Sequence, residues 1–279
     1  MKINKETTLT DHWDGQKYRA NSSPQQRRAE EVINRIPFNG SERILDIGCG
    51  DGRISLFLAA KLNPDGSVVG VDFSESMYTE AQNLLVHKNV PNLSFMMGDA
   101  QQLSFQNEFD MITGFSFFQW VEDKETSLRN FNNALKPGGK VYLYFNPDHG
   151  RQIHIDDSIS YVMSLPKWSH YLKDKKSGVV MSSPRQLTEL IEKSGLLLEK
   201  MEIVSTEDKF ENKEAFIQWI FGWMDSLKFI PGDQRHPFVT EIVDDYLRKV
   251  GISEDGSFIL YDCMMELILQ KNLARFIPE

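Results

Sequence analysis

The 279-residue sequence predicts an α/β fold, with a doubly wound, mostly parallel sheet of seven strands, helices on both faces and a helical cap. Three observations support this prediction. Short apolar runs alternate with amphipathic stretches through the first half of the chain. A glycine-rich turn, GCGDG at 48–52, directly follows the first apolar run. After Asn146 helical patterns follow one another without the strands that a regular alternation requires, which indicates a cap over the sheet.

Each expected element is defined by its apolar period and by the residues that begin or end it. The expected strands cover 43–48, 67–73, 93–99, 109–117, 140–145, 196–210 and 258–271. The expected helices cover 24–36, 52–62, 74–88, 124–136, 158–165, 182–195, 212–227 and 237–251. Ser23 is the expected N-cap of the first helix, and Ser183 caps the helix that ends at Gly195. Loops are expected over 146–157 and around Trp168 and Tyr171.

These elements divide the chain into segments with different expected tasks. Residues 1–40 form an N-terminal helical lid segment, and residues 41–150 form the cofactor-binding core. The cap is expected from two insertions, 151–182 and 211–252. Residues 183–210 and 253–279 complete the sheet domain.

Charge and composition exclude several classes of protein. The formal net charge of −9 argues against broad nucleic-acid binding, which normally needs a basic surface. No apolar run is long enough to span a membrane and the N-terminus lacks a signal-peptide pattern, so we expect a cytoplasmic protein without membrane insertion. The two cysteines, Cys49 and Cys263, are expected to be free. His149 and His154, with the aspartates near them, fit no zinc spacing, so no metal site is expected.

The glycine-rich turn indicates a nucleotide-like cofactor, and its neighbours narrow the choice. The dinucleotide pattern G-x-G-x-x-G requires a third glycine where Arg53 stands. Asp46 and Asp51 are unsuitable for holding a pyrophosphate, but they suit a ligand that carries an ammonium and a sulfonium. Asp72, at the end of the second strand, can accept hydrogen bonds from ribose hydroxyls. A nucleoside without a pyrophosphate, such as S-adenosylmethionine, satisfies both conditions.

Five motifs in order resemble those of class I S-adenosylmethionine-dependent methyltransferases, which have a Rossmann-like fold. The motifs are LDIGCGDG at 45–52, VVGVDFSESM at 68–77, GDAQQLSF at 98–105, FDMITGFSFFQWV at 109–121 and LKPGGKVYL at 135–143. The resemblance implies an enzyme that transfers a methyl group from S-adenosylmethionine to a small molecule and releases S-adenosylhomocysteine.

The resemblance also implies a role for each residue that matches a motif. Gly48 and Gly50 would lie beside the methionine part with Asp46 near its ammonium, Asp72 would bind the ribose, and Phe73 and Met77 would flank adenine. Asp99 and Ala100 would lie at the adenine edge, and Phe115 and Ser116 would border the sulfonium. On the residues alone, Phe73 and Met77 also fit core positions and Asp99 also fits a turn cap, so both interpretations stay open.

A narrower resemblance is to methyltransferases that act on small carboxylic acids, such as trans-aconitate and juvenile hormone acid methyltransferases. It is carried by YRANSSPQQRRA at 18–29, FQWV at 118–121 and LPKWSHYLKD at 165–174. It implies that Gln25 and Trp120 hold the acceptor carboxylate and that Tyr18 closes over the cofactor. Many of these relatives carry His where this chain has Gln119, so a role for that His as a base does not transfer.

The chemistry of a carboxylate acceptor is consistent with this difference. A free carboxylate has a pKa of about 4, so at pH 7 it is already a nucleophile and needs no general base. The cap is rich in aromatic residues and has only isolated arginines, Arg151 and Arg185, which favours an apolar or aromatic acid over a tricarboxylate. Gln25 also fits a solvated helix position and Trp120 a packing position.

Three other functions stay open at this point. A phenol, amine or thiol acceptor would require a base that the sequence does not identify. The chain also fits a cofactor-binding partner protein without turnover, because an intact cofactor loop does not prove catalysis. The least favoured alternative is an NAD-dependent dehydrogenase, because of Arg53 and the acidic loop.

Overall fold

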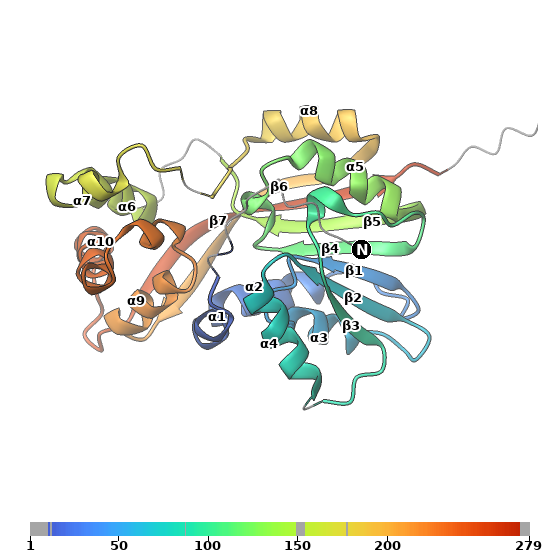
Figure 1. Cartoon of the computed structure of the whole chain (residues 1–279), viewed down its shortest axis with the longest axis horizontal. Coiled ribbons are helices and arrows are strands. Elements are labelled where there is room, and N and C mark those ends of the chain that lie inside the picture. The colour runs from blue at the N-terminus through green and yellow to red at the C-terminus, as the bar shows by residue number, and fades with distance from the viewer. Residues whose placement is uncertain (1–10, 12, 87, 149–153, 177, 274–279) are drawn as a thin grey trace, which may run out of the picture.

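The computed structural model describes residues 11, 13–86, 88–148, 154–176 and 178–273. Its centre is a seven-stranded sheet with the strand order β3-β2-β1-β4-β5-β7-β6 (Figure 1). The strands are β1 (Arg43–Ile47), β2 (Ser67–Asp72), β3 (Leu93–Met97), β4 (Phe109–Phe115), β5 (Leu135–Phe145), β6 (Leu196–Phe210) and β7 (Phe258–Lys271). Strands β1 to β5 are parallel, whereas β7 lies antiparallel between β5 and β6. The predicted seven-stranded, mostly parallel fold is confirmed.

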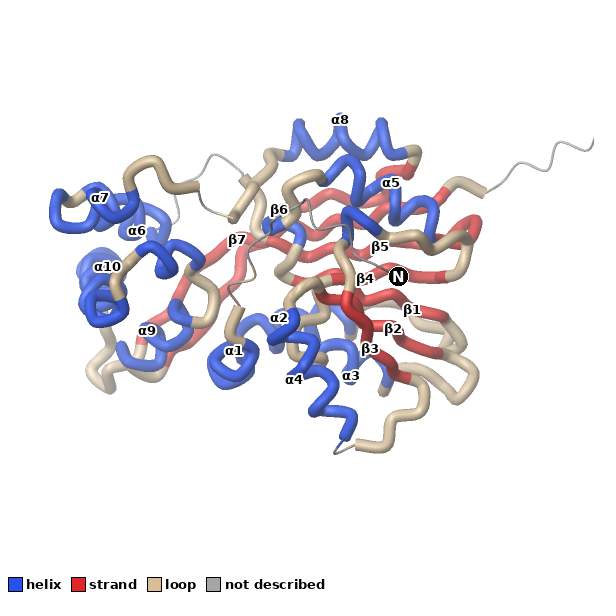
Figure 2. The backbone as a smooth tube through the Cα atoms, in the orientation of Figure 1, coloured by secondary structure: helices blue, strands red, loops and turns tan. Residues whose placement is uncertain are grey.

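Helices cover both faces of the sheet, as Figure 2 shows. One face carries α2 (Ser23–Ile33), α3 (Arg53–Ala59) and α4 (Glu75–Val86), and the other carries α5 (Lys124–Ala134) and α8 (Pro184–Ser194). A short helix, α1 (Gly15–Asn21), packs against α4. Two separate apolar clusters fill the spaces between the sheet and its two helical layers. This two-sided burial explains why the parallel strands are almost continuous apolar runs in the sequence.

The long antiparallel strands β6 and β7 extend beyond the other strands, and the cap lies at their projecting end (Figure 1). The cap helices are α6 (His154–Ser164), α7 (Pro166–Leu172), α9 (Lys213–Phe221) and α10 (Arg235–Val250). The described residues also form four short 3₁₀ helices, η1 (Ala100–Gln102), η2 (Phe118–Trp120), η3 (Asp225–Phe229) and η4 (Gly232–Gln234). The cap has an apolar cluster of its own, which includes Phe216, Phe238 and Tyr246 together with the ends of β6 and β7. We retain the division into lid, core, cap and sheet segments as a proposal.

The first predicted helix differs from α2 at both ends. The helix begins at Ser23 and ends at Ile33, and Ser22 rather than Ser23 occupies the N-cap position. The Ser22 hydroxyl accepts a hydrogen bond from Arg53 Nη2 at 2.5 Å and makes no cap bond of its own. A contact with a residue distant in sequence therefore replaces the local capping that the sequence predicts.

The two predicted loops after Asn146 were partly wrong. Trp168 and Tyr171 lie in α7, which is too short for its apolar period to be recognised in the sequence. Residues 154–157 form the first turn of α6, whereas 149–153 lie outside the described residues. Both cysteines are free as predicted, with Cys49 buried and Cys263 partly exposed.

Candidate active site

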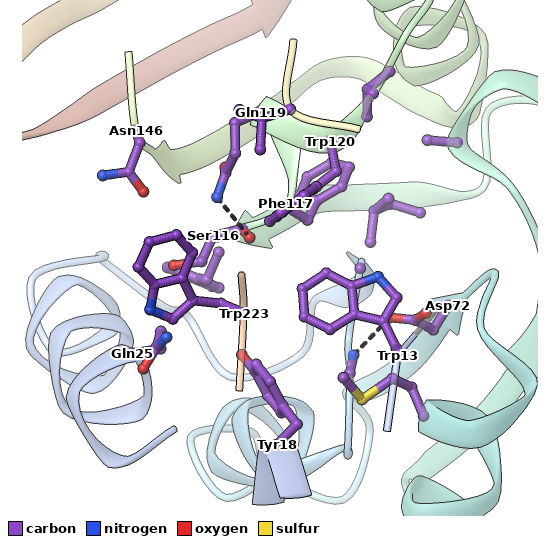
Figure 3. A pocket seen from close by; sticks show the side chains of 18 of the residues that line it. Trp13, Tyr18, Gln25, Asp72, Ser116, Phe117, Gln119, Trp120, Asn146 and Trp223 are labelled. Carbon is purple, nitrogen blue, oxygen red and sulfur yellow. Dashed lines mark hydrogen bonds between the residues drawn. The ribbon is translucent and has the colours of Figure 1, made fainter. Parts of the chain in front are cut away.

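One cavity lies where the carboxyl ends of β1, β2 and β4 meet the cap (Figure 3). Every residue predicted for the site lines it except Asp46. The predicted residues on its wall are Tyr18, Gln25, Gly48, Gly50, Asp72, Phe73, Met77, Asp99, Ala100, Phe115, Ser116 and Trp120. The carboxyl edge of a parallel sheet is where open α/β folds bind ligands. The structure thus brings these residues together, while their individual roles remain proposals.

The glycine loop after β1 has a backbone that only glycine adopts easily. Gly48 and Gly50 have φ angles of +68° and +55°. A methyl group on Gly48 would overlap Cβ of Phe117 and lie 2.6 Å from its Cγ, whereas one on Gly50 would meet only Tyr18 Cε1, at 3.7 Å. The loop is therefore packed closely on the Phe117 side and open toward Tyr18.

Asp72 stabilises this loop and faces the cavity. One carboxylate oxygen accepts a hydrogen bond from the Gly50 N–H at 2.8 Å (Figure 3). The other accepts one from the Ser74 N–H at 3.0 Å. Burial raises the pKa of Asp72 to about 6, so the side chain is mostly ionised at pH 7. Each oxygen retains a lone pair that can accept from a ribose hydroxyl. Asp72 therefore fits the predicted cofactor.

The residues proposed to contact adenine lie on the cavity wall, and some of them also have a structural role. Asp99 caps η1 by accepting a hydrogen bond from Gln101 N at 2.9 Å, so its interpretation as a turn cap is correct, and it also lines the cavity. Met77 is buried and Phe73 is partly exposed, and both lie on the cavity wall. An apolar wall beside a carboxylate fits an adenine ring with its amino group. Together with Asp72, this wall matches an adenosine-bearing cofactor.

Asp46 is the one predicted site residue that does not line the cavity, so its place near the cofactor ammonium stays a prediction. Its two oxygens accept hydrogen bonds from Ser55 Oγ at 2.6 Å and Thr113 Oγ1 at 2.8 Å, and burial raises its pKa to about 6. We propose that Asp46 stabilises the glycine loop through these two hydrogen bonds. Asp51 also lies outside the cavity wall and pairs with Arg53, with 2.6 Å between Oδ2 and Nε. Neither loop carboxylate is therefore on the cavity wall.

Several residues of the acceptor side of the cavity were not identified from the sequence. They are Trp13, Arg28, Asn146, Asp156 and Asp262, together with Trp219 and Trp223, two of the cap aromatic residues whose helical spacing favours a core position. Arg28 could have been found, because it lies one helical turn after Gln25 and thus on the same face of α2. Of the two arginines considered for a carboxylate, Arg185 is exposed on α8 and pairs with Glu189, and Arg151 lies outside the described residues.

Ser116 and Gln119 form the junction between the cofactor side and the acceptor side. Ser116 has a φ of +56°, a left-handed conformation that is unfavourable for serine. Gln119 Nε2 donates to the Ser116 carbonyl at 3.0 Å (Figure 3). The Ser116 N–H donates to the Tyr144 carbonyl at 2.7 Å. The structure thus holds a strained backbone on the cavity wall.

A segment of the cap-side chain, 178–181, is tied to the core by buried polar groups. The Val180 N–H donates to the Gln119 carbonyl at 2.7 Å, and the Gly178 N–H donates to Asp225 at 2.8 Å. Lys124 Nζ donates to the carbonyls of Val121 at 2.7 Å and Val180 at 2.6 Å. Val179 and Met181 of this segment line the cavity. These bonds therefore position part of the cavity wall.

The buried Lys124 ammonium predicts a specific dependence of stability on pH. Burial lowers the pKa of Lys124 to about 8, below the ordinary lysine value of 10.5. Between these pH values the unfolded chain binds more protons than the folded chain, so the free energy of unfolding rises with pH. We expect the wild type to gain about 1 kcal/mol or more over Lys124→Met between pH 7.5 and 9.5 in urea unfolding. A difference that stays constant over this range would contradict the lowered pKa.

Within the described parts of the chain, no helix is long and apolar enough to cross a bilayer. No group of three or more metal-ligating side chains is found there either. Because 149–153 are outside the described residues, the absence of a metal site near His149 remains a prediction.

Comparison with known proteins agrees with the geometry of the cavity. Residues 44–139 match a family described as "Methyltransferase domain". The malonyl-[acyl-carrier protein] O-methyltransferase of Priestia megaterium is 25% identical over 91% of this chain and 93% of its own length. The trans-aconitate 2-methyltransferase of Azoarcus sp. is 29% identical, but over only 49% of this chain and 54% of its own length.

Solved structures agree on the fold. Phosphoethanolamine N-methyltransferase 2 of Haemonchus contortus, in complex with S-adenosyl-L-methionine, superposes with a TM-score of 0.63 at 17% identity. The superposition covers 95% of this chain and 58% of that protein. The matched domain contains β1 to β4 and the glycine loop, which carry the cofactor side of the cavity. The chain therefore contains a methyltransferase domain at 44–139 and is an S-adenosylmethionine-dependent methyltransferase.

Proposed function

We propose that the enzyme methylates an oxygen of a free carboxylate on a small molecule. The observation that carries this proposal is a pair of neutral N–H donors on the acceptor side. Trp219 Nε1 donates to Gln25 Oε1 at 2.9 Å, which leaves the amide N–H groups of Gln25 for a ligand. Trp223 Nε1 is buried and has no hydrogen-bond partner among the described residues, and its ring lies 5.2 Å from that of Trp219. Two converging donors without a charge suit a carboxylate that must stay nucleophilic.

The proposed tasks of the chain are positioning and exclusion of water. S-adenosylmethionine, when bound, supplies a methyl group activated by a sulfonium. Gln25 and Trp223 hold the acceptor carboxylate without a full ion pair, which would reduce its nucleophilicity. Trp120 packs edge-on against Trp13 with 5.1 Å between ring centroids, and we propose that these rings and Tyr18 exclude water. No proton has to be removed from a carboxylate at neutral pH.

The relatives and the cavity wall support this acceptor. A malonyl group attached through one end carries one free carboxylate, and the Priestia relative is named a malonyl-[acyl-carrier protein] O-methyltransferase. Aromatic side chains, among them Trp13, Phe117, Trp120 and Trp219, form much of the wall. An apolar or aromatic body attached to the carboxylate would bury these surfaces.

A second candidate function is methylation of an amine or hydroxyl group, and Asp156 is the observation that favours it. The sequence did not identify a base for such an acceptor, but Asp156 on α6 lines the cavity. Burial and the nearby Asp262 raise the pKa of Asp156 to about 6, which is suitable for accepting a proton near neutral pH.

The two candidates are separated by steady-state kinetics on matched acceptors. We would measure S-adenosylhomocysteine release with aromatic and aliphatic acids and with the corresponding amides, amines and phenols. With an acid, Trp223→Phe should raise KM about 10-fold, the effect of one lost hydrogen bond to a charged group, and leave cofactor affinity unchanged. Trp168→Phe is the matched control, because the Trp168 indole donates to Glu241 in the cap, outside the cavity wall. Turnover of amines or phenols alone, with a large loss of kcat in Asp156→Asn, would reject the carboxyl proposal.

A further inference from the structure

The acceptor side of the cavity presents hydrogen-bond acceptors that the described protein does not satisfy. Gln119 is buried at 6% exposure and its Nε2 is used by Ser116, but its Oε1 has no partner among the described residues. The Asp156 carboxylate has no hydrogen bond or ion pair to any described residue. A buried acceptor without a donor, such as Gln119 Oε1, costs about 1–3 kcal/mol, so a ligand that supplies a donor there would relieve this cost. Asp156 is more exposed, and its negative charge on the cavity wall would attract an ammonium or hydroxyl group of the same ligand.

The charges around Asp156 show why it remains unsatisfied. Among the described residues, the charged groups that act on it are Asp262 and Asp157, and both raise its pKa. Arg28 is the cation nearest to Asp262, with 2.9 Å between Nη1 and Oδ2. Its other terminal nitrogen pairs with Asp208, which is fully buried. Asp208 also pairs with Arg27, so two arginines face the two carboxylates of Asp208 and Asp262, and both terminal nitrogens of Arg28 are used there rather than by Asp156.

The same cavity also holds donors without acceptors. Trp223 Nε1 is one, and Nε of Arg28, a side chain that is 7% exposed and lines the cavity, is another. A ligand that fits this wall must offer both acceptors and donors. A plain polycarboxylate offers only acceptors, and its additional negative charge would meet Asp156 and Asp262.

We infer that the acceptor is an amino- or hydroxy-carboxylic acid, whose ammonium or hydroxyl group binds to Asp156 and Gln119 while its carboxylate is methylated. This inference rests on the carboxyl acceptor proposed above and names its chemical class. Asp156 is then a specificity-determining residue that selects for a donor group and against a second carboxylate. Asn146 Nδ2 lies 3.4 Å from both oxygens of Asp262 and completes the polar end of the cavity.

The test uses matched acids that differ in a single substituent. The acids are derivatives of 3-phenylpropanoic acid that carry hydrogen, hydroxyl, amino or carboxylate at one position. This position is either the α-carbon or the ring carbon opposite the side chain. We expect the amino or hydroxyl member at one of these positions to exceed the unsubstituted acid at least 10-fold in kcat/KM, mainly through KM. The carboxylate members should not be turned over. Each product is identified as an ester by its lability in mild alkali.

Two variants assign the preference to Asp156. Asp156→Asn should remove most of the advantage of the amino member, whereas Asp157→Asn, the adjacent carboxylate on α6 outside the cavity wall, should retain it. Equal rates for all acids, a preference for the dicarboxylates, or a preference unchanged in Asp156→Asn would each overturn the inference while leaving carboxyl methylation intact. If no acid yields an ester at all, the proposed function itself fails.

Discussion

Replacing Asp72 with alanine should weaken binding of S-adenosylhomocysteine about 100-fold or more. In the cofactor-free enzyme the carboxylate accepts from Gly50 N at 2.8 Å and from Ser74 N at 3.0 Å, so its removal leaves two backbone donors without their partner. The proposed ribose contact is lost as well. Hydrogen bonds to a charged group are worth about 1.5–3 kcal/mol each, which accounts for the size of the effect. Isothermal titration calorimetry would measure it.

A control and a second readout distinguish this role from general damage to the fold. Asp65→Ala removes an exposed carboxylate in the turn before β2, away from the cavity, and should leave affinity unchanged. Because the pKa of Asp72 is about 6, wild-type affinity should fall as the pH drops through 6 and the carboxylate becomes protonated. A loss of less than threefold in Asp72→Ala would contradict the proposed cofactor site.

Gly48→Ala should lower the free energy of unfolding by about 3 kcal/mol, and Gly50→Ala by only about 1 kcal/mol. Both residues have positive φ angles, +68° and +55°, so both substitutions incur the backbone strain of about 1–2 kcal/mol. Only at Gly48 would the added methyl group also overlap the side chain of Phe117, which is buried and cannot move freely. Urea unfolding of the three proteins measures the difference.

The two glycine variants control for each other, because the same substitution is made at two positions of the same loop. Gly50→Ala should still reduce cofactor affinity, since Gly50 lines the cavity. Equal destabilisation by both substitutions would show that contact with Phe117 does not determine the conformation of the loop.

The sheet and the cofactor side of the cavity were predictable because local sequence determines them. The two long strands 196–210 and 258–271 were found with their observed bounds, since continuous β-favouring runs ended at clear turn residues. The glycine loop and Asp72 follow directly from strand ends in the sequence. Short helices were harder to predict from the sequence. Helix α7 was missed because its seven residues span only two turns.

The direction of side chains was less predictable, because contacts between distant segments decide it. Asp46 follows a recognisable pattern, but Ser55 and Thr113 turn its carboxylate away from the cavity. Arg28 lies on the cavity wall because Asp208 and Asp262, on two later strands, pair with it. Nothing in the sequence around these residues indicates that pairing.

The central claim is that a carboxylate oxygen receives the methyl group, and the product itself tests this most directly. The enzyme would be incubated with S-adenosylmethionine carrying a deuterated methyl group and with the acid that turns over best. Mass spectrometry would follow the product before and after mild alkaline treatment. The proposal predicts a labelled product that loses its methyl group in alkali and regenerates the starting acid. A labelled product that survives alkali would place the methyl group on nitrogen, carbon or an ether oxygen and contradict carboxyl methylation.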